Sequence, residues 1–450
     1  MIRARRFLVA RRRMAGLSLI EMMIALVMAF IVAAGIIAVF SSTSSSNKAQ
    51  AQMAVLQEEG RFAIHSLRSD LANVNGGYCS NSGGNAGVTS SGLYLDALRS
   101  PIVYSSDTTA NTNAIHDNTL TMATPTQAFV LPSNLFMRGY QCTTTACTPA
   151  DPNTTVSAIP PMGIAIGDRV MGTDVLTVRY IRPGSGWAIV PSGSAAGTTI
   201  SPTSASSGIV ATIALNPLPG EDAASEFKSG DLAMLATCSM ANVYSVTVSG
   251  DTITPTSDNY AQPPDISQGN LAAPTLFDFT QDFQTVTYFL EVVDAGNGHT
   301  TGELVRRVNG TDQPLVRGVE RLDFRYGILD ADGGTRFLTA AEVDSAVDSS
   351  GNSIPCPPQM PPLSGVTADS SAGCLWRAVQ TIEVHILMDG QTPLYTLTPA
   401  EMNYIYSIDG NTTPQPPGST RNVTPAQQGF PNQLLRREFT TLVALRNFNP

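Results

Sequence analysis

Residues 16–40 read GLSLIEMMIALVMAFIVAAGIIAVF, and no side chain from Met22 to Phe40 is polar. A helix of these 19 residues would be about 28 Å long, close to the roughly 30 Å hydrocarbon core of a bilayer. The stretch therefore predicts a membrane-spanning helix over residues 17–40.

A basic leader precedes this helix. Residues 1–16, MIRARRFLVARRRMAG, contain six arginines and no acidic residue, and without them the chain has 20 basic and 36 acidic residues. Because basic flanks stay in the cytoplasm, we expect the N-terminus there and the rest of the chain in the periplasm or beyond. The pattern predicts a single-pass, exported protein.

Two simpler kinds of N-terminal segment fit less well. A cleaved signal peptide has a shorter apolar run and a small-residue cleavage site, and Phe40-Ser41 offers no such site. A plain membrane anchor accounts for the length but not for Glu21, because a carboxylate in lipid costs several kcal/mol unless it is paired.

Residues 16–21, GLSLIE, resemble the class III signal of type IV prepilins, which has a basic leader, a glycine, a hydrophobic first mature residue and a glutamate at mature position five. In that family a prepilin peptidase cuts after the glycine and methylates the new amino group. The resemblance implies cleavage between Gly16 and Leu17 and N-methylation of Leu17. It also implies an assembly role for Glu21, whose carboxylate would neutralise the N-terminal ammonium of a neighbouring subunit inside a filament.

The signal departs from that of major pilins in two ways. The first mature residue is Leu17 rather than Phe, and the chain has no proline between residues 1 and 100. Both departures favour a minor pilin or a pseudopilin over the bulk filament subunit.

The composition limits the classes of function that remain. Charged residues are 14% of the chain, against roughly 25% in an average soluble domain, and the net charge is −10. No nucleic-acid partner is expected, because phosphate contacts need clustered Lys and Arg. The abundance of small, polar and turn-forming residues excludes an all-helical protein and, with the apolar helix, predicts an α+β fold.

A helical pattern continues beyond the apolar stretch, over residues 41–75. Residues 41–47, SSTSSSN, are poor helix formers, so we expect local loosening there. Helical periodicity then returns, and Gly76-Gly77 ends it. The predicted apolar stripe consists of Met53, Leu56, Gly60, Ala63, Leu67, Leu71 and Val74.

Period-two patterns separated by turns predict a mainly antiparallel β head over residues 76–450. The head either divides into two lobes near residues 250–275 or forms one enlarged sheet. The predicted strands are Asp174–Ile181, Ile209–Leu215, Asp231–Ala236, Val243–Val248, Val286–Val292, Gly302–Arg307, Val319–Tyr326, Val379–Met388 and Arg437–Arg446.

Several of these segments resemble the PilW family of type IV pilus minor pilins. They are GTDVLTVRYI (172–181), SGDLAML (229–235), CSMANVYSVT (238–247), GELVRRV (302–308), VERLDFRYGILDADG (319–333), AVQTIEVHILM (378–388) and LRREFTTLVALRN (435–447). The resemblance implies a subunit of the priming complex at the pilus tip, with other minor pilins, the major pilin and a tip adhesin as partners.

The even number of cysteines favours disulfides in an exported chain. The spacing suggests a local Cys142–Cys147 loop and a Cys356–Cys374 staple, which leaves Cys79 with Cys238. Six cysteines allow fifteen connectivities, so other pairings stay open.

No constellation in the sequence predicts an enzyme or a cofactor. His65, His116, His299 and His385 are scattered, and the chain has no HExxH, G-x-S-x-G or phosphate-binding loop. Asp330, Asp332 and Glu342 resemble part of a calcium loop, but the position-five ligand is missing and Glu342 falls one residue late, which favours a solvated turn.

These observations together predict a minor pilin in the inner membrane, with a cytoplasmic N-terminus and a periplasmic head. Its first partners would be the prepilin peptidase and membrane lipid, and its final location the pilus. A type II secretion pseudopilin shares the N-terminal signal and is the nearest alternative. A membrane-tethered periplasmic adhesin is the alternative from another class, but it would need neither Gly16 nor Glu21.

Overall fold

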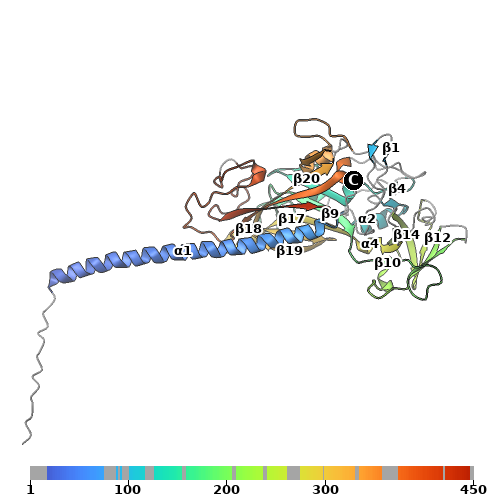
Figure 1. Cartoon of the computed structure of the whole chain (residues 1–450), viewed down its shortest axis with the longest axis horizontal. Coiled ribbons are helices and arrows are strands. Elements are labelled where there is room, and N and C mark those ends of the chain that lie inside the picture. Colours follow the sequence, from blue (N-terminus) through green and yellow to red (C-terminus); the bar gives the residue numbers. More distant parts are fainter. Residues whose placement is uncertain are drawn as a thin grey trace, which may run out of the picture. The chain divides into compact units, whose positions relative to one another are not determined.

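A computed structural model of the chain describes residues 18–74, 88–89, 92–93, 101–116, 126–154, 159–204, 209–236, 241–260, 274–296, 298–329, 334–356, 373–418 and 421–445. Residues 1–54 and 55–450 form two compact units. The long helix α1 and the strands of a mainly antiparallel β domain make this an α+β protein (Figure 1).

Helix α1 runs without interruption over Leu19–Leu71, a total of 53 residues. The loosening expected at residues 41–47 is absent, so that prediction was wrong. Serine and threonine cost only about 0.5 kcal/mol each relative to alanine, and a helix that already exists on one side need not be nucleated again. Ser46 Oγ also accepts a hydrogen bond from Gln50 Nε2 at 3.4 Å, one turn later.

The second part of α1 buries most of the predicted stripe in the head. Leu56, Gly60, Ala63, Leu67 and Leu71 are buried, as is Val74 just beyond the helix end, whereas Met53 is half-buried. Apart from Gly60, the buried members share one hydrophobic core with residues of an eight-stranded and a four-stranded sheet. In Figure 1 this part of α1 lies along β17 and β18.

The eight-stranded sheet has the order β19-β18-β17-β9-β5-β6, and β8 pairs with both β17 and β7. Glycines shape the β17–β18 hairpin, because Gly296 and Gly298 have φ values of 87° and 76°. The strands are β5 (Met137–Cys142), β6 (Cys147–Thr148), β7 (Met162–Gly163), β8 (Arg169–Val170), β9 (Val175–Ile181), β17 (Phe283–Gly296), β18 (His299–Val308) and β19 (Thr311–Arg317).

The four-stranded sheet has the order β21-β20-β22-β23 and is antiparallel throughout. Its strands are β20 (Val319–Leu329), β21 (Thr335–Leu338), β22 (Val379–Asp389) and β23 (Arg436–Ala444). Together with the previous sheet it provides most of the core against which α1 packs.

A nine-stranded sheet contains the order β10-β16-β13-β14-β15-β12-β11, with β3 joining β14 to β4. Two further hydrophobic clusters pack around it. Its strands are β3 (Ile102–Val103), β4 (Phe129–Val130), β10 (Trp187–Ala188), β11 (Thr199–Pro202), β12 (Val210–Ala214), β13 (Leu232–Ala236), β14 (Ala241–Ser249), β15 (Thr252–Pro255) and β16 (Thr275–Asp278).

Each predicted strand overlaps a strand of the structure, and β15 and β16, on either side of residues 256–274, belong to the same sheet. The remaining elements are short. They are β1 (Val88–Thr89), β2 (Gly92–Leu93), α2 (Thr108–Ala114), α3 (Ser133–Phe136), α4 (Phe279–Asp282), α5 (Ala340–Ser345) and the 3-10 turns η2 (Pro152–Thr154), η3 (Ala224–Glu226), η5 (Cys374–Ala378) and η6 (Ser407–Asp409).

We predict that Gly302→Ala destabilises the head by about 2 kcal/mol, a typical cost of overpacking. A Cβ atom on Gly302 of β18 would collide with the main-chain carbonyl oxygen of Val319 in β20, and a backbone atom cannot turn away. Gly418→Ala is the matched control, because a Cβ there meets open space. Equal midpoints of denaturant unfolding for the two variants would contradict the prediction.

Candidate functional site

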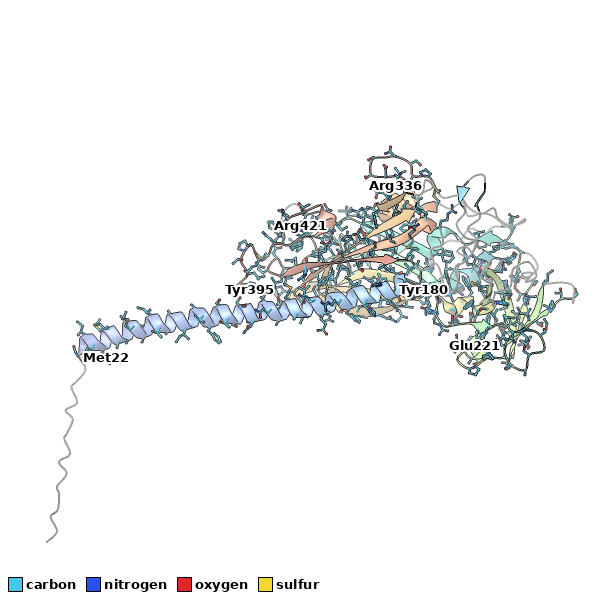
Figure 2. The ribbon with its side chains drawn as sticks, viewed as in Figure 1. Met22, Tyr180, Glu221, Arg336, Tyr395 and Arg421 are labelled. Atoms are coloured by element: carbon cyan, nitrogen blue, oxygen red, sulfur yellow. A yellow bond between two sulfur atoms is a disulfide. The ribbon has the colours of Figure 1, made fainter. Side chains whose placement is uncertain are left out.

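The first half of α1 exposes an apolar surface. Its large apolar side chains between Leu19 and Phe40 are 53–78% exposed. Figure 2 shows the start of this surface at Met22. The helix is long and apolar enough to cross a membrane. Such a surface needs lipid or other helices to cover it.

Glu21 lies in the first turn of this helix, and its carboxylate is held close to the N-terminus. The Ser18 N–H donates to Glu21 Oε2 at 3.0 Å, while Ser18 Oγ accepts from the Ile20 N–H at 3.4 Å. This reciprocal arrangement resembles a capping box, which satisfies main-chain donors that a helix start leaves free. Gly16 and Leu17 lie outside the described residues.

The other end of α1 is attached to the head by one carboxylate, Asp70. Two tyrosine hydroxyls donate to it, Tyr180 to Oδ1 at 2.9 Å and Tyr288 to Oδ2 at 2.6 Å. Arg306 contacts the same two oxygens, Nη2 with Oδ1 at 3.1 Å and Nε with Oδ2. The partners come from β9, β17 and β18, three adjacent strands, and Tyr180 lies beside the end of α1 in Figure 2. We call these four residues the Asp70 clamp.

Burial sets the chemistry of the Asp70 clamp. The side chain of Asp70 is 10% exposed and that of Arg306 21%. Burial and the charge of Asp70 raise the pKa of Tyr180 and of Tyr288, so both hydroxyls keep their protons and donate. Burial opposes the charge on Arg306, but Asp70 more than compensates and raises the pKa of Arg306.

The sequence-based prediction missed the Asp70 clamp, although one signal was present. Asp70 follows Ala63 by seven residues and Leu67 by three, so it falls on the buried stripe. A charged residue on a buried helix face requires a partner in the domain that covers it.

Glu59 makes a second polar contact between α1 and the head. Gln391 Nε2 donates to Glu59 Oε2 at 2.8 Å and to the carbonyl oxygen of Arg317 at 3.3 Å. Burial raises the pKa of Glu59, although the hydrogen bond from Gln391 opposes that shift. Gln391 is the second residue of the long segment 390–435, which connects β22 to β23.

Buried arginines hold segment 390–435 on the four-stranded sheet. Arg436, the first residue of β23, meets both oxygens of Glu320 in β20 at 2.7 Å, and its Nη1 donates to the carbonyl oxygen of Asn432 in the segment at 2.9 Å. The guanidinium carbon of Arg421 stacks 3.5 Å from the centre of the Tyr404 ring, and Arg421 Nη1 lies 3.1 Å from Asp409 Oδ2. Figure 2 labels Arg421 in this segment. These side-chain contacts give the described residues of the segment a fixed path.

Asp409 also links this segment to β20. Arg321 Nη1 lies 3.5 Å from Asp409 Oδ1, and Arg321 Nη2 lies 3.1 Å from Asp323 Oδ2. Asp323 in turn accepts a hydrogen bond from the hydroxyl of Tyr406.

His385 of β22 contacts segment 390–435 through Ser407 and β23 through Glu438. His385 Nδ1 lies 2.9 Å from Ser407 Oγ and 3.1 Å from Glu438 Oε1. The other ring nitrogen, Nε2, lies 3.5 Å from Glu383 Oε1. These contacts connect β22 to β23 and to segment 390–435.

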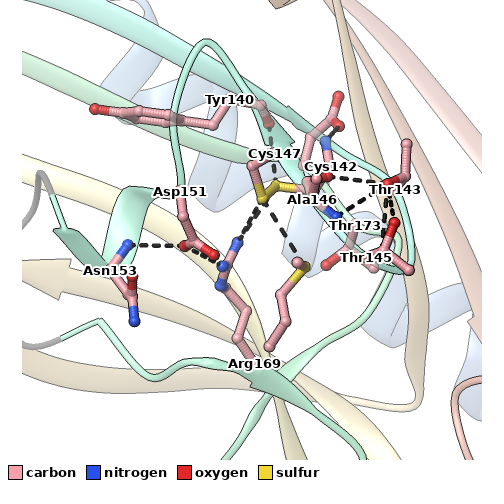
Figure 3. Close-up of a disulfide and its surroundings, with 12 residues drawn as sticks. Tyr140, Cys142, Thr143, Thr145, Ala146, Cys147, Asp151, Asn153, Arg169 and Thr173 are labelled. Carbon is pink, nitrogen blue, oxygen red and sulfur yellow. Dashed lines mark hydrogen bonds and ion pairs between the residues drawn. A yellow bond between two sulfur atoms is a disulfide. The ribbon is translucent and has the colours of Figure 1, made fainter.

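Four of the six cysteines and one of the three candidate calcium ligands lie among the described residues. Disulfides join Cys142 to Cys147 (Figure 3) and Cys356 to Cys374. Cys79 and Cys238 lie outside the described residues, as do Asp330 and Asp332. Glu342 caps α5, where its Oε2 accepts from the Thr339 N–H at 2.7 Å. Within the described ranges, no three His, Cys, Asp or Glu side chains are grouped so that they could hold a metal ion.

The other histidines do not form a cluster with His385. His65 is exposed on α1, and His299 is half-buried at the start of β18. His116 Nε2 lies 3.0 Å from the carbonyl oxygen of Thr280, and burial lowers the pKa of His116.

Comparison with known families confirms the resemblance stated above for the C-terminal part of the chain. Residues 287–447 match the family model of PilW, described as type IV pilus-assembly protein W. The match covers most of β17 and all of β18 to β23, and it relates this part to type IV pilus assembly. The resembling segments at 172–247 lie outside it. Searches of curated proteins and of solved structures gave no match.

We predict that Asp70→Ala lowers the free energy of unfolding by on the order of 3 kcal/mol, because it leaves the charge of Arg306 and two tyrosine hydroxyls without their acceptor. Hydrogen exchange should rise most in Val55–Leu71. Glu58→Ala, which removes an exposed carboxylate from the same helix, is the control. Protection of Val55–Leu71 at the level of the control would show that the Asp70 clamp does not hold the helix.

We predict that His385→Gln destabilises the protein more at pH 6 than at pH 8.5. Burial opposes protonation of His385, but Glu438 and Glu383 outweigh it and raise the pKa above the ordinary 6.5. The stabilisation is therefore complete below pH 6.5 and is lost as pH rises through the raised pKa. Thermal unfolding of wild type and variant across this range gives the difference, and a pH-independent difference would refute the prediction.

Proposed function

We propose that this protein is a minor pilin of the type IV pilus, incorporated at or near the tip, where it primes assembly. One observation carries the proposal: an exposed apolar helix with Glu21 in its first turn is continuous with the helix that packs into a head containing the PilW match. The mechanism is assembly, without catalysis or a cofactor.

Maturation prepares the helix for packing. A prepilin peptidase cuts between Gly16 and Leu17 and methylates Leu17, which leaves an ammonium group four residues before Glu21. Glu21 holds the N–H of Ser18 in its own chain, in an exposed position. In the filament it exchanges solvent contacts for the ammonium of a neighbouring subunit. Such a pair is stronger away from water than at a surface.

The head then provides the lateral contacts. Before assembly the subunit is a single-pass inner-membrane protein, with the leader in the cytoplasm and the head in the periplasm. It moves from membrane lipid into the pilus when the helix leaves the bilayer. Its partners are other minor pilins, the major pilin and a tip adhesin, and the Asp70 clamp keeps the head attached to the helix during this transfer.

The PilW match favours this proposal over a type II secretion pseudopilin, which would share the N-terminal signal. A membrane-tethered adhesin would use the same apolar helix but would have no need for a carboxylate in its first turn.

We predict that Glu21→Ala abolishes incorporation and strongly reduces pilus number, while membrane insertion and folding of the head continue. The reason is that the buried ammonium of a neighbour loses its partner, which costs several kcal/mol. Pili are counted by electron microscopy in a strain that has only the variant. Glu58→Ala, on an exposed face of the same helix, should assemble normally.

The intact mass of the membrane-extracted protein serves as the processing control. Both variants should begin at methylated Leu17 when the prepilin peptidase is present and at Met1 when it is absent. An uncut wild-type chain in a strain with active peptidase would sink the proposal. Normal pilus number with Glu21→Ala would remove the assembly role of the carboxylate alone.

A further inference from the structure

Arg169 places a buried positive charge directly against a disulfide (Figure 3). Its side chain is 0% exposed. Nη1 lies 3.3 Å from Cys142 Sγ and 3.5 Å from Cys147 Sγ, while Nη2 lies 2.8 Å from Asp151 Oδ1 and Nε 3.4 Å from the carbonyl oxygen of Pro160.

This site has little negative charge to balance the guanidinium. Burial lowers the pKa of Arg169, and Asp151 opposes that shift only in part. The side chain of Asp151 is itself 35% exposed, so solvent screens its charge. A disulfide sulfur is a weak acceptor, whereas a thiolate sulfur has a full negative charge. The surroundings of Nη1 therefore suit a thiolate better than the disulfide.

The two cysteines differ in burial. Cys142 is buried at the end of β5, and its N–H donates to Asp174 Oδ1 at 3.1 Å. Cys147 is half-buried in β6, the strand at the edge of the sheet. An attacking thiolate from solvent therefore reaches Cys147 first, and Cys142 is the leaving group beside Arg169.

The turn between the cysteines has its own support. The Thr143 N–H donates to the carbonyl oxygen of Ala146 at 2.8 Å, and the Ala146 N–H donates to Thr143 Oγ1 at 3.1 Å. The strand β5 also pairs with β9 independently of the disulfide. Opening the disulfide therefore leaves both cysteines in place to close it again.

We propose that Cys142–Cys147 is a reversible thiol–disulfide exchange site, in which Cys147 forms the mixed disulfide and Arg169 stabilises the Cys142 thiolate. The partner is a protein with two thiols. The site does not depend on the assembly function.

A thiolate of the partner attacks Cys147 Sγ, the Cys142–Cys147 bond breaks, and its electron pair goes to Cys142 Sγ. The second thiolate of the partner then attacks its own sulfur in the mixed disulfide and releases the Cys147 thiolate. The two cysteines are reduced and the partner is oxidised to a disulfide. Of the two protons that the partner's thiols lose, one ends on Cys147 and the other goes to solvent, because Cys142 stays a thiolate beside Arg169. Oxidation of the site is the reverse sequence.

The test is a redox titration of the full-length protein in detergent against mixtures of reduced and oxidised dithiothreitol. Free thiols are alkylated and each cysteine pair is quantified by peptide mass spectrometry. Arg169→Gln should lower the equilibrium constant for reduction of Cys142–Cys147 about tenfold, equivalent to about 30 mV for a two-electron couple. Asp151→Asn removes the carboxylate that partly neutralises Arg169, and it should raise the equilibrium constant for reduction of Cys142–Cys147. The Cys356–Cys374 pair should titrate equally in all three proteins.

A second measurement identifies the attacked sulfur. Reduced glutathione is added briefly, the reaction is stopped with acid, and the glutathione adduct is located by mass spectrometry, with Cys147 as the expected site. An adduct mainly on Cys142, or unchanged constants in both variants, would overturn the proposal. If Arg169→Gln fails to fold, as judged by near-ultraviolet circular dichroism, Asp151→Asn decides alone, and its failure to raise the constant would also overturn it.

Discussion

The hydrogen-bonded charge of Asp70 fixes the position of the second part of α1 against the head. An apolar stripe could slide or rotate over a sheet with little change in buried area, but a buried carboxylate must keep its partners. Tyr180, Tyr288 and Arg306 meet Asp70 from three adjacent strands, so only one rotation of the helix satisfies all of them. The hydrophobic core stabilises the packing of α1 on the head, and the Asp70 clamp fixes the rotation of the helix and its position along the strands.

The same use of buried charge recurs in the C-terminal part of the head. The described residues of segment 390–435 form the short 3-10 turn η6 and the isolated Tyr404–Gln415 pair, so most of their main-chain groups do not pair in a sheet. Arg321 of β20 holds Asp409, and Arg436 of β23 donates to the carbonyl oxygens of Asn432 and Leu434, so the segment has fixed points on the four-stranded sheet. Removing one member of such a pair is costly because its partner stays buried. The described residues of this long connection between β22 and β23 thereby keep a definite path.

The sequence was informative where a pattern is local. Periodicity predicted the buried stripe of α1 and the position of each of the nine strands, because side-chain direction repeats every 3.6 or 2 residues. It failed at residues 41–47, where low helix propensity did not interrupt an established helix. The Asp70 clamp was out of reach because its four members lie up to 236 residues apart. Arg169 was likewise not connected to Cys142 by any local spacing.

The pairing of β9 with β17 determines where the head can accept insertions during evolution. Ile181, the last residue of β9, is directly opposite Phe283, the first residue of β17. Residues 182–282, between these two strands, contain most of the nine-stranded sheet. The two ends of this segment therefore lie next to each other at the edge of the β9–β17 pair. An insertion with such closely spaced ends can be lengthened, shortened or exchanged without moving the strands that hold Asp70. Selection can therefore change this segment as a unit while the Asp70 clamp stays the same.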